Sequence, residues 1–337
     1  MSDRKEIKKV YKILLKILVL VMIALLSSVP VFRGRMFDTG ESLLWCFRLA
    51  RLFPATLVEP TCLAAIIFLR LAFVLSSYLF FYILNSTNGG DFLDTISGVI
   101  LLSFSPYQLY IAFDKTDITD MILWILILLF ASVTVSIAKA IKEKKSVRII
   151  SLVSIDLLIL CGVVISYFLS HVSESVLSFK ESGYAFGEMF TSFFYRENHP
   201  GLGIALLLAV FLWLYYIVIN SRKESEKKAE AVFFILAVSF MVLSSLHFPW
   251  NVIIRMVPFL EKIINKIESP TIFLGISYFC FSVPAVRGLS YSRKVKNEYV
   301  GKVLCFLVLF LAVVIGVFLN SQYMSLQHPL GFETINQ

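Results

Sequence analysis

The first polar segment of the sequence combines an acidic pair with two arginines. Asp38 and Glu41 come just before an amphipathic stretch, and Arg48 and Arg51 lie within it. A carboxylate in this position can act as a general base, and arginines on a helix face can bind phosphate groups. We therefore take Asp38 and Glu41 as candidate catalytic residues. Arg48 and Arg51 are candidates for substrate binding, and the structural alternative is a helix capped by Asp38 whose arginines reach lipid headgroups.

Arg70 is a second candidate because it lies inside a long apolar run. A charge within the hydrocarbon of a bilayer is costly and usually faces a polar interior. Asp156 is the one acidic residue of comparable depth in another run, but the two side chains would differ by roughly 10 Å along the membrane normal. A direct ion pair is therefore not favoured. Arg70 contacts helix carbonyls or water in one interpretation and lines a substrate or proton pathway in the other.

A third candidate region begins where Pro106 is expected to break or kink an apolar run. Tyr107 is suited to the outer membrane interface. Three carboxylates follow, Asp114, Asp117 and Asp120, on the turn into the next run. They could bind a divalent cation, although a solvated turn with a helix cap is the more common outcome. We assign no metal site or other cofactor, and we keep Tyr107 and Asp120 as candidate substrate contacts.

The composition indicates the kind of protein that positions these residues. Of 337 residues, 58% are hydrophobic and only 16% are charged, which is typical of a polytopic membrane protein and not of a soluble domain. A membrane-spanning helix needs about 20 apolar residues. Nine candidate runs occur, at roughly residues 13–32, 61–84, 92–113, 117–138, 149–170, 201–220, 231–248, 270–287 and 303–320. The sequence thus predicts an all-α, polytopic helical membrane protein, with residues 1–337 forming a single integral membrane domain and no separate soluble domain.

The basic residues predict the orientation of the chain. Most of the 31 lysines and arginines fall in four clusters, within residues 4–16, 139–148, 222–228 and 287–302. By the positive-inside rule these clusters are cytoplasmic, so the N-terminus is inside and the C-terminus is outside the cell membrane. The net charge of +8 is then a signal of topology and of attraction to anionic lipid. We expect the lipid bilayer as a partner and no nucleic acid, and oligomeric state is left open.

An elbow on the outer face separates the seventh and eighth predicted spans. An apolar run ends at Phe248-Pro249-Trp250, and Trp250 is placed like an aromatic anchor at headgroup level. Apolar residues then recur at helical spacing from residue 257 onwards. This pattern predicts an amphipathic helix over 258–267 that lies in the interface without crossing it. The first outer segment, around Arg48, is expected to form a similar interfacial helix.

Several short motifs, taken in their order, resemble a known group of bacterial membrane proteins. The motifs are Leu-Arg-Leu-Ala-Phe around Arg70, Ser-Pro-Tyr at 105–107, Gly-Tyr-Ala-Phe-Gly-Glu-Met-Phe at 183–190, His-Pro-Gly-Leu-Gly at 199–203, and Phe-Pro-Trp followed by Glu-Ser-Pro. In this order the chain resembles the YfhO-like and 6-pyruvoyl-tetrahydropterin-synthase-related membrane proteins. Those proteins are similar to members of the GT-C superfold of glycosyltransferases.

The resemblance implies an enzyme that takes a sugar from a polyprenyl-phosphate carrier at the outer face. It implies a catalytic acid in the first outer loop, which here is Asp38 or Glu41. The chain departs from the family pattern at Lys115 and Asp120, where an arginine and a glutamate are usual, and at Asn251, where an arginine often follows Phe-Pro-Trp. An inactive relative is therefore one alternative. The other is a non-enzymatic polytopic transporter or assembly factor for cell-envelope polymers, in which Arg70 and Asp156 would matter and Asp38 would not.

Overall fold

The computed structural model describes ten segments of the chain, and their secondary structure is helical. The described residues are 2–29, 55–87, 90–113, 118–144, 146–170, 183–190, 201–219, 228–257, 270–294 and 298–326. The helices are α1 (Ser2–Leu26), α3 (Ala55–Thr87), α4 (Phe92–Ser103), α5 (Pro106–Phe113), α6 (Ile118–Lys142), α7 (Ser146–Ser170), α9 (Phe186–Phe190), α10 (Ile204–Ile219), α11 (Lys228–Leu243), α12 (Trp250–Met256), α14 (Thr271–Arg293) and α15 (Glu298–Leu326). Within these segments β pairing is confined to one isolated bridge, between Tyr184 and Ser245.

The described helices confirm the all-α prediction, and several of them could span a membrane. Five of them, α3, α6, α7, α14 and α15, are long and apolar enough to cross a membrane. The pair α4 and α5 makes a sixth candidate if it is one broken span, and α10 and α11 are apolar but shorter. Each of the nine predicted runs overlaps a helix. The number of nine spans and the orientation of the termini stay predictions.

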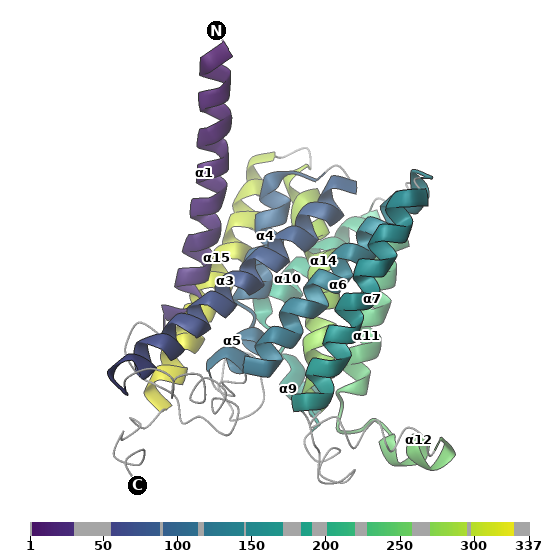
Figure 1. Ribbon diagram of the computed structural model, residues 1–337. Coiled ribbons are helices and arrows are strands. Elements are labelled where there is room, and N and C mark those ends of the chain that lie inside the picture. Colours follow the sequence, from purple (N-terminus) through teal and green to yellow (C-terminus); the bar gives the residue numbers. More distant parts are fainter. Residues whose placement is uncertain are drawn as a thin grey trace.

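Helix α14 lies at the centre of the bundle. It contacts α4, α5, α10, α11 and α15, and every residue from 281 to 290 is buried (Figure 1). Small residues allow this close packing. A Cβ atom added to Gly288 would lie 2.4 Å from the carbonyl oxygen of Ala209, so α14 and α10 approach each other with backbone nearly in contact.

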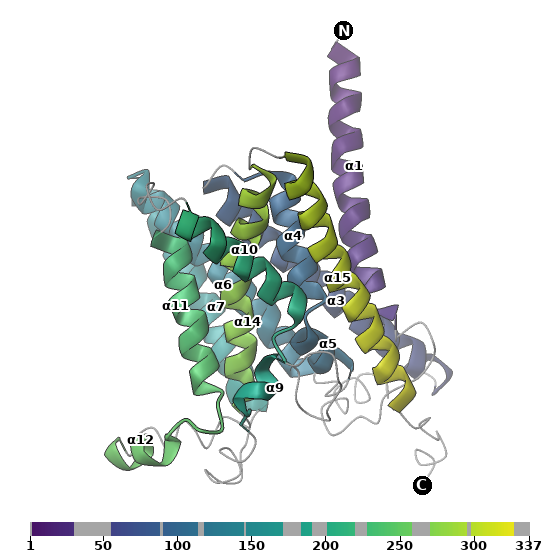
Figure 2. The same ribbon diagram turned by 180° about the vertical axis from the view of Figure 1, so that it is seen from behind.

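Two helices lie at the periphery. Helix α7 packs against α6, and none of the residues in its apolar stretch is buried. Helix α1 packs against α3 and α4 through Leu20, Ile23 and Ala24, whereas its N-terminal half extends beyond the end of the bundle (Figures 1 and 2). The two views also place α5, α9 and α12 at the opposite end, with α12 set apart to one side of the bundle. We call that end the short-helix end.

Two helices extend well beyond the bounds that the sequence predicts. Helix α3 begins at Ala55, before the expected start at residue 61. Helix α14 continues to Arg293, so Arg287 and Arg293 lie in a helix and not in a loop. Charge alone suggested a loop, but both arginines have carboxylate partners on neighbouring helices, as described below, and such pairing lets them stay in the bundle.

The elbow also differs from its prediction. A short helix, α12, precedes Pro258 and ends at Met256, and Val257 is in an extended conformation with φ −131° and ψ 83°. The residue before a proline avoids the helical region, which explains this end. Trp250 is buried, and its ring stacks on Phe273 of α14 with 5.7 Å between centroids. The predicted interfacial helix over 258–267 falls outside the described residues.

Candidate functional site

The described residues contain three of the seven candidate site residues. Arg70 lies in α3, Tyr107 in α5 and Asp120 in α6, and all three side chains are buried. The other four candidates, Asp38, Glu41, Arg48 and Arg51, lie outside the described residues. The three described candidates therefore all lie within the helix bundle.

The break between α4 and α5 has a local cause in the sequence. Pro106 lacks an N–H group and occupies the first position of α5, where a helix tolerates proline best. The Ser105 hydroxyl oxygen accepts a hydrogen bond of 3.1 Å from the backbone N–H of Gln108 and so caps α5. The two helix axes meet at 50°. This confirms the break predicted at Pro106.

Side chains from two other helices bind the carbonyl groups that the break leaves open. The Tyr278 hydroxyl of α14 donates to the carbonyl oxygen of Leu101 at 3.0 Å. The Arg70 guanidinium of α3 donates through Nη2 to the carbonyl oxygen of Ser103 at 2.7 Å. A membrane protein must satisfy such backbone groups internally, because the hydrocarbon offers no water. Arg70 and Tyr278 therefore hold the broken span in place.

Arg70 is otherwise surrounded by aromatic rings. Its side chain is 1% exposed, and its Cζ atom lies 5.7 Å from the ring centroid of Phe73 and 5.9 Å from that of Phe113. Its Nε atom is buried and makes no hydrogen bond. Asp156 is not its partner, because that carboxylate accepts a hydrogen bond of 3.1 Å from the Thr134 hydroxyl between α6 and α7. The contact with a helix carbonyl matches the structural interpretation given above for Arg70.

Tyr107 is buried in the bundle and lacks the exposed position that an interfacial anchor would have. It is 5% exposed, and its ring meets that of Trp124 edge to face with 5.5 Å between centroids. A Cβ atom added to Gly275 of α14 would lie 2.3 Å from the Tyr107 ring, so the absence of a side chain there makes room for the tyrosine. The prediction relied on the general preference of tyrosine for interfaces and could not include this distant glycine.

A small cavity lies beside the break. Its volume is about 10 Å³, enough for roughly one water molecule. Phe73, Tyr107, Trp124 and Tyr278 provide aromatic walls, and the side of the cavity formed by the break carries Ser105 and Gln108. Of these lining residues, Phe73 is the one that also contacts Arg70.

Asp120 lies in the first turn of α6 and is 6% exposed. A carboxylate is stabilised there by the positive end of the helix dipole. Asp114 and Asp117, the other two members of the predicted acidic cluster, lie outside the described residues. Within the described segments, no group of three or more histidine, cysteine or acidic side chains is arranged to hold a metal ion.

The motif at 183–190 pairs with the beginning of the elbow at the short-helix end. The Tyr184 N–H donates to the carbonyl oxygen of Ser244 at 3.0 Å, and the Leu246 N–H donates to the carbonyl oxygen of Tyr184 at 2.8 Å. Tyr184 is fully buried. These backbone bonds join two segments that are distant in the sequence.

The motif at 199–203 meets the same group of segments. The Leu202 N–H donates to the carbonyl oxygen of Met189 at 2.7 Å. Gly203 has a φ of +82°, and a Cβ atom there would lie 3.3 Å from Cδ of Pro106. Glycine is favoured at this position because other residues rarely adopt such a φ angle. The short-helix end thus brings together four segments: Ser-Pro-Tyr, residues 183–190, residues 201–203 and the elbow.

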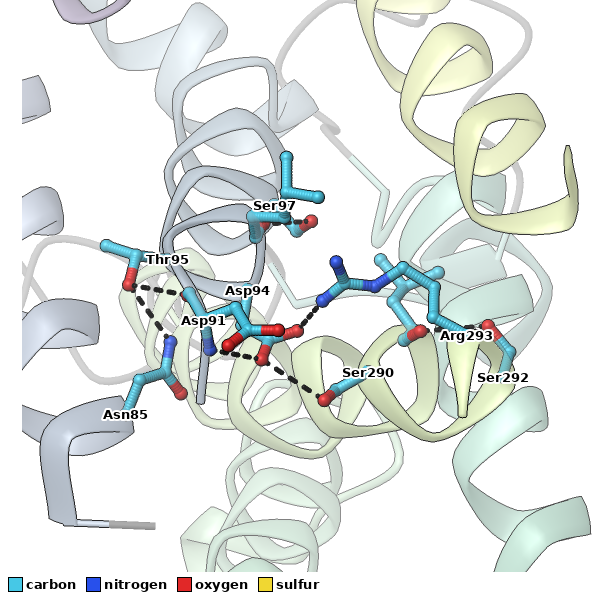
Figure 3. A network of polar contacts seen from close by, with 10 residues as sticks. Asn85, Asp91, Asp94, Thr95, Ser97, Ser290, Ser292 and Arg293 are labelled. Carbon is cyan, nitrogen blue, oxygen red and sulfur yellow. Dashed lines mark hydrogen bonds and ion pairs between the residues drawn. The ribbon is translucent and has the colours of Figure 1, made fainter. Parts of the chain in front are cut away.

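The opposite end carries a network around Asp94 that the sequence analysis missed. Asp94 of α4 forms an ion pair with Arg293 of α14 and accepts a hydrogen bond of 3.1 Å from the Ser290 hydroxyl (Figure 3). It also accepts one of 2.9 Å from the backbone N–H of Asp91, as part of a capping box at the start of α4. One buried carboxylate therefore caps its own helix and ties that helix to α14.

A second buried carboxylate, Glu230 of α11, lies at the same end. Its Oε1 atom is 3.4 Å from Nε of Arg287, and its Oε2 atom accepts a hydrogen bond of 2.8 Å from the indole N–H of Trp213. The Tyr291 hydroxyl donates to Oε1 at 3.3 Å, and the Tyr291 ring stacks on Tyr216 at 4.0 Å. This cluster joins α10, α11 and α14. We call this end of the bundle the ion-paired end.

A partial signal for these pairs was present in the sequence. Asp94 follows Asp91 at the spacing of a capping box, and Glu230 lies at the edge of an apolar run. Each acid therefore marked the start of a helix. Its arginine partner was not predictable, because Arg293 is 199 residues from Asp94 and no local pattern links them.

The chain was compared with family models, with curated proteins and with solved structures, and none of them matches.

Proposed function

We propose that this protein is a membrane-embedded glycosyltransferase that takes a sugar from a polyprenyl-phosphate carrier at the outer face of the cell membrane. The observation that supports the proposal is the meeting of four separate segments at the short-helix end. These segments belong to the motifs that resemble a glycosyltransferase superfold. The chain between α1 and α3, with Asp38 and Glu41, joins two helices that end and begin at this same end (Figure 1).

The roles of the residues follow from the chemistry of sugar transfer. Asp38, or Glu41, takes the proton from an acceptor hydroxyl while the acceptor oxygen forms a bond to the anomeric carbon. The bond between that carbon and the carrier phosphate breaks, and the phosphate leaves with the electron pair. Arg48 and Arg51 bind the phosphate charge that develops. A divalent cation is an additional candidate for this task.

The test is a transfer assay with the full-length protein in membrane vesicles. The probe is a synthetic polyprenyl-phosphate sugar with a radioactive label. We expect Asp38→Asn to lower transfer by about 100-fold or more, as is usual when a general base is lost. Asp91→Asn is the matched control, because Asp91 is an exposed acid at the ion-paired end, and it should leave transfer unchanged. Full transfer by both Asp38→Asn and Glu41→Gln would contradict the proposal.

A second candidate function is transport or assembly of cell-envelope polymers without catalysis. Arg70 supports it, because this buried cation lies beside a broken span, a combination found at substrate sites of transporters. Arg70→Gln and Asp38→Asn separate the two functions. Loss of export with Arg70→Gln alone would favour transport, and loss of sugar transfer with Asp38→Asn alone would favour the transferase.

A further inference from the structure

Arg70 differs from two other arginines in the interior of the bundle. Arg287 is paired with Glu230, and Arg293 is paired with Asp94. Among the described residues Arg70 has no carboxylate partner, and its single hydrogen bond goes to the Ser103 carbonyl. The protein therefore neutralises two of these guanidinium groups with acids of its own and leaves the third, which is 1% exposed, with a positive charge.

An uncompensated charge in this position is costly. Removing a guanidinium from water carries a large desolvation penalty, and one carbonyl and two aromatic rings offset only part of it. The Nε atom of Arg70 is also buried without an acceptor. The site thus has a surplus of donors and of positive charge, and the group that would complete it is an acceptor with negative charge.

The surroundings of the break add donors for such a group. Helix α5 begins at the break, but Pro106 has no N–H and the backbone N–H groups of Gln108 and Leu109 already donate to Ser105. Further donors must therefore come from side chains at the break. The Ser105 hydroxyl and the side-chain amide of Gln108 both line the cavity, and each can donate to an anion.

We propose that Arg70, Ser105 and Gln108 form an internal binding site for a small oxyanion, a carboxylate or a phosphate group. Phe73 lines the cavity and its ring also contacts the Arg70 guanidinium, so one side chain links the two. The cavity of about 10 Å³ is too small for an oxyanion while the ring is in this position. A turn of the Phe73 side chain joins the cavity to Arg70 and opens the site.

This site does not depend on the proposed sugar transfer. It shares the break with the proposed transferase but uses neither of the candidate catalytic residues, Asp38 and Glu41. If the protein is a transporter, as in the second candidate function, the site implies that its cargo carries a carboxylate or a phosphate group. Anion binding and sugar transfer are measured in separate assays. One proposal can therefore be contradicted while the other still stands.

The test measures binding of labelled inorganic phosphate, and separately of acetate, to the full-length protein in phosphatidylcholine nanodiscs. We expect saturable binding that weakens by about tenfold or more in Arg70→Gln, because a charge-assisted hydrogen bond is lost. Glutamine keeps a side-chain N–H donor but is shorter than arginine, so the folded yield of this variant is measured first. Arg148→Gln is the matched control, because Arg148 is exposed at the start of α7, and it should bind like the wild type.

A second variant allows the test to be made if the first does not fold, and a second lipid shows whether the anion is a lipid headgroup. Gln108→Leu should weaken binding several-fold without a change of charge, and it tests the site if Arg70→Gln does not fold. Nanodiscs that contain phosphatidic acid test a lipid headgroup as the source of the anion. Stabilisation by this lipid that requires Arg70 would support the site with a lipid ligand. Absence of any Arg70-dependent response to phosphate, acetate or phosphatidic acid would overturn the proposal.

Discussion

The two ends of the helix bundle are held together by different interactions. At the ion-paired end, buried carboxylates on α4 and α11 bind arginines of α14, so charged side chains join long helices. At the short-helix end, backbone hydrogen bonds of Tyr184 and Met189 join short segments, and a glycine with positive φ lies against Pro106. Long helices joined by charge pairs make a rigid scaffold. At the short-helix end the side chains of Tyr184, Met189 and Leu202 are themselves buried, so the backbone bonds fix how these segments pack.

The largest expected effect concerns the ion-paired end. Glu230→Ala would leave Arg287 buried without a carboxylate and would remove the acceptor for the Trp213 indole. We expect a loss of about 3–5 kcal/mol in the free energy of unfolding. The measurement is a denaturant titration in detergent. The double variant Glu230→Leu with Arg287→Met should recover part of the loss, and Glu143→Gln, at an exposed acid, is the control. A loss below about 1 kcal/mol would mean that the pair is not a main support of this end.

A smaller effect is expected where α10 and α14 approach each other. The Cβ atom of Gly288→Ala would lie 2.4 Å from the Ala209 carbonyl oxygen and 2.6 Å from the Trp213 nitrogen, so the two helices must separate. We expect a cost of about 1–3 kcal/mol in stability, measured by thermal unfolding. The control is Gly187→Ala in α9, where an added Cβ atom meets nothing within 4 Å. Equal stability of the two variants would show that the close contact is not required.

The smallest effect on stability should come from the short-helix end. Gly203→Ala places a Cβ atom on a residue with φ +82°, which costs about 1–2 kcal/mol. Because Gly203 lies against Pro106, this change also shifts the segments that meet there. We expect sugar transfer to fall more than the unfolding temperature does, when both are measured on the same preparation. An unchanged transfer rate would argue against a functional site at this end.

The parts of the fold that the sequence predicted have local causes. Apolar runs indicated where helices occur, and Pro106 indicated the break, because a proline acts on its own helix. The boundaries of α14 were wrong because Arg287 and Arg293 were treated as loop charges, whereas each has an acid on another helix. Tyr107 was misplaced for a similar reason, since Gly275 on α14 creates the space for its ring. Contacts between distant segments have no counterpart in a local pattern.

The break between α4 and α5 has a consequence for the order in which the chain enters the membrane. The Leu101 carbonyl receives its donor from Tyr278 of α14, a helix that the ribosome makes long after α4. Until then this carbonyl has no permanent partner in the hydrocarbon, where an unsatisfied group costs several kcal/mol. We therefore predict that residues 92–113 pack stably only when α14 has been inserted. A chain that stops before Thr271 should leave this segment unstable and accessible to the proteases that clear incomplete membrane proteins.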